Sequence, residues 1–75
     1  MTITAAQCRA ARGLLAISQG ELARISGVSQ RAISDFEAGA TTAPMRANLA
    51  AIIGAFEKLG IEFLTDGVRL KPKDG

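Results

Sequence analysis

Residues 18–37 constrain the fold of this chain more than any other segment, because they contain two short helical patterns separated by a glycine turn. Ser18 and Glu21 have the spacing of a capping box, which starts a helix. Gly27 suits the left-handed conformation in which helices often end. Ser29 is a second capping serine, and it precedes the helical pattern Gln30–Glu37. The segment therefore predicts two short helices joined by a tight turn.

Helical patterns also lie on both sides of this segment. Thr4–Leu15 is rich in helix-forming residues and begins with a capping box between Thr4 and Gln7. After a loop, Pro44 is placed to start a further helix over Met45–Leu59. The residues expected to face the core are Ala5, Cys8, Arg12 and Leu15 in the first helix, Leu22, Val28, Ile33 and Phe36 in the central pair, and Leu49, Ile52, Ile53, Phe56 and Leu59 in the last helix.

The pattern changes after Gly60, where Asp66-Gly67 separates the alternating runs Ile61–Leu64 and Val68–Lys71. This arrangement predicts a β-hairpin. Two strands alone are marginally stable in water, so the hairpin either covers the core or pairs with its copy in another chain. Its apolar content favours a dimer interface, formed by Ile61, Phe63, Leu64, Val68 and Leu70. The expected organisation is a helical domain over residues 1–60, a dimerisation hairpin over 61–71 and a flexible tail over 72–75.

Composition narrows the functions that this chain can have. Its 75 residues suffice for one domain, and 9 Lys and Arg against 7 Asp and Glu give a net charge of only +2. The chain has no histidine and one cysteine, which excludes metal sites built on these residues, His-based catalytic triads and internal disulfides. We expect no cofactor, no metal and no enzymatic activity. No apolar run or leader pattern suggests a membrane, so a reduced cytoplasmic protein is expected.

The central segment Ser18–Glu37 resembles the helix-turn-helix of the Cro and λ-repressor-like regulators, the XRE family. The matching motifs are Ser-Gln at 18–19, Leu-Ala at 22–23, Gly-Val-Ser at 27–29, Ile-Ser at 33–34 and a Glu shortly before Gly39. The resemblance extends over Thr4–Leu59 and does not include the hairpin. It implies a mainly α fold, a four-helix λ-repressor-like DNA-binding domain, which here carries a C-terminal β-hairpin.

The resemblance also implies roles at matching positions, because the second helix of such a motif enters the major groove. Arg31 would pair with guanine through two hydrogen bonds, and Gln30 with adenine. The residues expected to face base edges are Gln30, Arg31, Ser34 and Asp35. The residues expected to contact phosphates are Gln19, Ser29, Thr41, Thr42 and Arg46.

Three charged residues need separate consideration. Asp35 departs from the family pattern, where this position is commonly basic or an amide. It can accept a hydrogen bond from cytosine, hold Arg31 in place, or repel phosphate. Arg12 lies on the expected inward face, and the resemblance implies that it forms a partly buried ion pair with Glu37.

These features predict a sequence-specific transcriptional regulator that binds double-stranded DNA. The simplest form is a homodimeric repressor that reads an inverted repeat. The resemblance implies a bacterial or phage setting, in which the protein is nucleoid-associated when bound. One alternative is an antitoxin or controller protein that also binds a protein partner. Another is a protein-interaction module of the same fold that has lost DNA binding, which the low charge, Asp35 and the uncharged loop favour.

Overall fold

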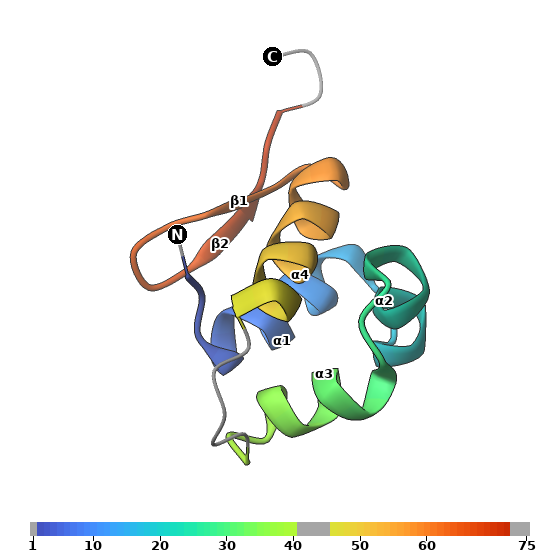
Figure 1. Ribbon diagram of the computed structural model, residues 1–75. Helices are drawn as coiled ribbons and strands as arrows, with labels where there is room; N and C mark the ends of the chain where they lie inside the picture. Colours follow the sequence, from blue (N-terminus) through green and yellow to red (C-terminus); the bar gives the residue numbers. More distant parts are fainter. Residues whose placement is uncertain (1, 41–45, 73–75) are drawn as a thin grey trace.

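The computed structural model describes residues 2–40 and 46–72 (Figure 1). The described elements are α1 (Ala5–Leu15), α2 (Gln19–Ser26), α3 (Gln30–Glu37), α4 (Arg46–Lys58), β1 (Ile61–Phe63) and β2 (Val68–Leu70). The predicted fold class is confirmed, since helices are followed by one antiparallel hairpin. None of the described helices is both long and apolar enough to cross a membrane.

The first two helices begin at the predicted capping boxes. Thr4 Oγ1 accepts a hydrogen bond from the Gln7 backbone N–H at 3.0 Å, and Gln7 Oε1 accepts one from the Thr4 N–H at 2.8 Å. Ser18 and Glu21 form the same reciprocal pair at the start of α2. At the other end of α2, Gly27 adopts a φ of 77°, which a residue without a Cβ tolerates best. Local sequence signals therefore set these helix ends.

The core lies between the helices and the inner face of the hairpin. Its largest fully buried side chains are Phe56, Leu22, Ile33, Ile52, Ile61 and Cys8. On α1, the core face also includes Gln7 and Ala11, which the sequence pattern did not indicate. The inward position predicted for Leu59 is wrong: this side chain is 38% exposed, because α4 ends at Lys58 and the chain turns at Gly60.

The hairpin shares this core with the helices. β1 pairs with β2 in an antiparallel register in which Ile61 lies opposite Leu70 and Phe63 opposite Val68. The ring of Phe63 packs edge-on against that of Phe56, with centroids 5.8 Å apart. Contacts with both α1 and α4 fix the hairpin on the helices. The two strands are thus stabilised by packing within one chain.

This packing changes the surface that the hairpin can offer to a second copy. Ile61 is fully buried within its own chain, so it is a core residue and not an accessible interface residue. Phe63 and Val68 are partly buried against the core. Leu64 and Leu70 remain 45% and 47% exposed. Leu70 lies directly opposite Ile61 in the register and therefore on the same face of the sheet, whereas Leu64 follows the end of β1 and lies outside the paired strands.

Gln7 joins α1 to the turn of the hairpin. Its Nε2 donates to the backbone oxygens of Leu64, at 2.7 Å, and Gly67, at 3.1 Å. We expect Gln7→Met to lower the free energy of unfolding by about 1–3 kcal/mol. The two carbonyl oxygens lose their donor, and the Thr4 N–H loses its acceptor in the capping box. Urea unfolding measures the change. Gln30→Met, at an exposed position, is the matched control, and equal stability of the two variants would contradict this role for Gln7.

Candidate nucleic-acid interface

α2 and α3 form a two-helix unit around a shared apolar wedge. Leu22 and Ile33 are fully buried, Val28 is 5% exposed, and Ala23 packs against them where the helices cross. Ser29 is the N-cap of α3, and its Oγ accepts a hydrogen bond from the Ala32 N–H at 3.1 Å. Figure 1 shows α3 at the edge of the molecule, on the side away from the hairpin. The outer face of α3 is therefore free of other described elements.

The predicted base-reading residues share this outer face, although they differ in exposure. Gln30 and Arg31 are exposed, whereas Ser34 and Asp35 are partly buried. Arg31 Nε lies 3.4 Å from Asp35 Oδ2, and the Arg31 side chain is 89% exposed. Asp35 is thus placed to hold Arg31, which is one of the roles considered for it. An exposed pair of this kind contributes only about 0–1 kcal/mol, so Arg31 can readily exchange it for a base.

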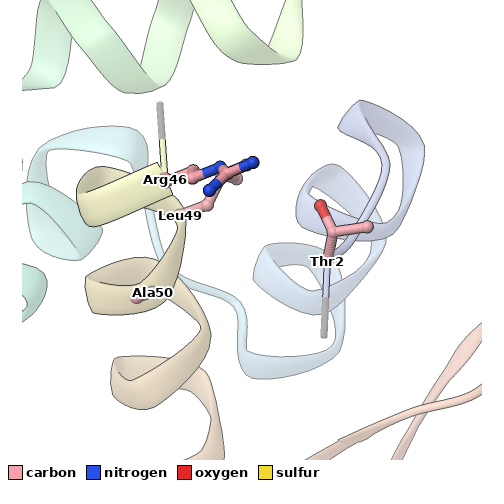
Figure 2. Close-up of a pocket in the computed structure, with 4 residues that line it drawn as sticks. All are labelled: Thr2, Arg46, Leu49 and Ala50. Atoms are coloured by element: carbon pink, nitrogen blue, oxygen red, sulfur yellow. The ribbon is translucent and has the colours of Figure 1, made fainter. Parts of the chain in front are cut away.

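The predicted phosphate-binding residues come from several elements. Ser29 is exposed at the start of α3, and Gln19 is partly buried at the start of α2. Arg46 begins α4 and lines an open cleft of about 500 Å³ together with Thr2, Leu49 and Ala50. Figure 2 shows its side chain extending from α4 toward the segment that bears Thr2. Thr41 and Thr42 lie outside the described residues.

The carboxylate of Glu37 anchors the C-terminal end of α3. Arg12 Nη2 lies 2.6 Å from Glu37 Oε1, and Arg12 Nε donates to Oε2 at 2.8 Å, which is the ion pair expected from the sequence. Gln19 Nε2 donates to Oε1 at 3.0 Å, and the Cys8 thiol donates to Oε2 at 3.1 Å. Arg9 donates from Nη1 to the backbone oxygen of Glu37. These contacts attach α3 to both α1 and α2.

Sequence reasoning did not assign Cys8 and Arg9 to this cluster. The sequence predicts Cys8 as a core residue only, and it assigns no role to Arg9. Their spacing from Arg12 was the available signal, because residues three and four apart lie on the same face of a helix. Only the position of the Glu37 backbone oxygen, at the end of another helix, gives Arg9 its partner.

Comparison with known families agrees with this geometry. A family model described as "Helix-turn-helix" matches residues 9–64, well over half of the chain. The chain belongs to the helix-turn-helix family. This XRE-like helix-turn-helix protein is a DNA-binding regulator, of a family that is not typically enzymatic. The match includes β1, whereas the sequence resemblance stopped at Leu59. No match is found among curated proteins.

Electrostatics keep the Glu37 cluster of the helix-turn-helix protein in one protonation state. Burial alone would raise the pKa of Glu37, but hydrogen bonds from Arg12, Gln19 and Cys8 outweigh this effect and lower the pKa to about 2. Burial, followed by the hydrogen bond to Glu37, raises the pKa of the Cys8 thiol to about 12. At neutral pH the carboxylate therefore accepts and the thiol donates.

The low pKa of Glu37 predicts a pH-dependent stability. The folded state holds this pKa at about 2, below its ordinary value of 4.5, so Glu37 contributes its full stabilisation above about pH 4.5. The contribution is lost as the pH falls from about 4.5 through about 2. We expect the stability difference between the wild type and Glu37→Gln to shrink over this interval. Urea unfolding at several pH values measures it, and a constant difference would contradict the assignment.

The described residues contain no group of three or more His, Cys, Asp or Glu side chains that could hold a metal ion. The candidate site of the helix-turn-helix protein consists of the exposed face of α3 and of the polar groups that flank it.

Proposed function

We propose that this protein is a sequence-specific transcriptional repressor whose homodimer reads an inverted repeat through the major groove. The observation that carries the proposal is the contrast between the two ends of α3. Its N-terminal half presents Gln30 and Arg31 to solvent, whereas the buried Glu37 side chain is fixed by contacts with Arg12 and Gln19. A recognition helix needs this combination, because side chains read bases reliably only from a rigid backbone.

Base reading would depend mainly on Arg31 and Gln30. The guanidinium of Arg31 can donate two hydrogen bonds to the O6 and N7 of guanine, and the amide of Gln30 can pair with adenine. Ser34 and Asp35 lie one turn further along α3 and complete the base-facing set. Asp35 would orient Arg31, or accept a hydrogen bond from cytosine.

Phosphate contacts would surround this set. The Ser29 hydroxyl accepts a hydrogen bond from α3 and can still donate one to a phosphate. The side-chain amide of Gln19 donates one N–H to Glu37, and its second N–H could donate to a phosphate. Arg46 would supply a positive charge at the start of α4. With a net charge of only +2, the protein would bind non-specific DNA weakly.

A homodimer would require a self-complementary surface, and the hairpin offers two exposed leucines for it. Leu64 follows the end of β1 and Leu70 ends β2, so each marks a different candidate interface. Sedimentation of the Leu64→Lys and Leu70→Lys variants distinguishes them, since lysine in an apolar interface weakens association. A monomeric wild type, or dimerisation unaffected by both changes, would contradict a dimer through the hairpin.

Selection of binding sites from random double-stranded DNA tests the function directly. We expect an inverted repeat with half-sites about one helical turn, roughly 34 Å, apart. A single unrepeated site would contradict the dimeric mode of reading. No enrichment, even at low salt, would contradict DNA recognition and favour the protein-interaction module. Such a regulator would act in the cytoplasm of a bacterium or of a phage host.

A further inference from the structure

Gly20 lies in the first turn of α2, where the side chain of Gln30 approaches it. A Cβ added to Gly20 would lie 3.4 Å from Gln30 Oε1, 3.9 Å from Gln30 Cδ and 3.7 Å from Ser18 Oγ. By contrast, a Cβ added to the exposed helical residue Gly13 would meet nothing within 4 Å. The amide end of Gln30 therefore turns back from α3 and lies over a position of α2 that has no side chain.

The electrostatics of the α2 terminus favour this placement. The first backbone N–H groups of a helix have no acceptor within the helix, and they carry the positive end of its dipole. The amide oxygen of Gln30 is the atom closest to the added Cβ at Gly20, so the negative end of the amide lies beside the first turn of α2. Without the contact, a long exposed glutamine side chain would sample many rotamers.

We propose that Gly20 is a specificity-determining position, because its missing side chain leaves the space in which the Gln30 amide is held before DNA binds. The inference rests on the proposed function, in which Gln30 reads a base. Gly20 itself touches no base in this scheme. It is a positioning residue, and it acts through the conformation of Gln30.

Two substitutions at Gly20 separate this effect from helix propensity. Alanine and leucine both stabilise a helix relative to glycine, by comparable amounts. The alanine Cβ would make an ordinary contact at 3.4 Å, so Gly20→Ala should retain the conformation of Gln30. In Gly20→Leu, the additional carbons would occupy the space of the Gln30 amide and displace it. Gly13→Ala and Gly13→Leu are the matched controls.

Site selection from random DNA is the readout, with Gln30→Ala used to identify the base pair that Gln30 reads. We expect Gly20→Leu to reduce the preference at this base pair by about fivefold or more, since one good base contact contributes about 1–3 kcal/mol. Gly20→Ala and both Gly13 variants should keep the wild-type preference. In the Gln30→Ala background, Gly20→Leu should cause no further change.

Each contrary result identifies what is wrong. If the wild type is selective and Gly20→Leu keeps the wild-type preference at the base pair that Gln30 reads, the role of Gly20 is overturned and the proposed function stands. The same holds if Gly20→Leu weakens every position equally, or acts equally in the Gln30→Ala background. A wild type that selects no sequence overturns the proposed function, and with it the inference.

Discussion

Arg12→Met is expected to lower the free energy of unfolding by about 3–5 kcal/mol, because it leaves the carboxylate of Glu37 buried without its main partner. The Glu37 side chain is only 3% exposed, and Arg12 meets it with two nitrogens. Methionine keeps much of the volume of arginine but provides no donor. Urea or thermal unfolding measures the loss, and an unchanged transition would show that the ion pair contributes nothing.

Two further variants separate loss of the pair from loss of arginine as such. In the double variant Arg12→Met/Glu37→Met no charge is stranded, so we expect it to be more stable than Arg12→Met alone. Arg24→Met removes an exposed arginine from α2 and should change stability by about 0.5 kcal/mol or less. A double variant less stable than the single one would contradict the explanation by a stranded charge.

Arg31→Ala is expected to weaken binding to the selected DNA site by roughly 5- to 150-fold, because a bidentate contact with guanine contributes about 1–3 kcal/mol. The side chain is 89% exposed and its pair with Asp35 is weak, so stability should change little. Gel shifts with the selected site and with a site mutated at the guanine measure the effect. Equal loss on both sites would indicate that Arg31 contacts phosphate and does not read a base.

Asp35 provides a companion test for this surface. Asp35→Asn removes a negative charge from the outer face of α3 while conserving its shape. We expect tighter binding to DNA of unrelated sequence at low salt, because repulsion of phosphate is relieved. Unchanged non-specific binding of Asp35→Asn would show that Asp35 does not face the phosphates.

Arg31→Lys tests the contact of Arg31 with guanine. Lysine should not replace arginine there, since an ammonium group cannot form the bidentate contact.

Much of the fold was predictable because its signals are local. The starts of α1 and α2 follow from capping boxes within four residues of sequence, and Gly27 ends α2 through its own backbone freedom. The hairpin turn is also predicted by a local signal, the Asp66-Gly67 pair between the two strands. In contrast, the burial of Gln7 depends on carbonyl oxygens about sixty residues away along the chain. No local pattern carries such information.

The candidate site shows the same division. The segment Ser18–Glu37 by itself determined a pair of helices and the residues that α3 can expose, because capping, turn formation and helical periodicity act over a few residues. Only the tertiary structure decided that Cys8 and Arg9 join the Glu37 cluster, that Ile61 belongs to the core, and that Gln30 lies over Gly20. These relations depend on how separate elements approach one another. The packing of the whole core determines that approach, and no single element specifies it.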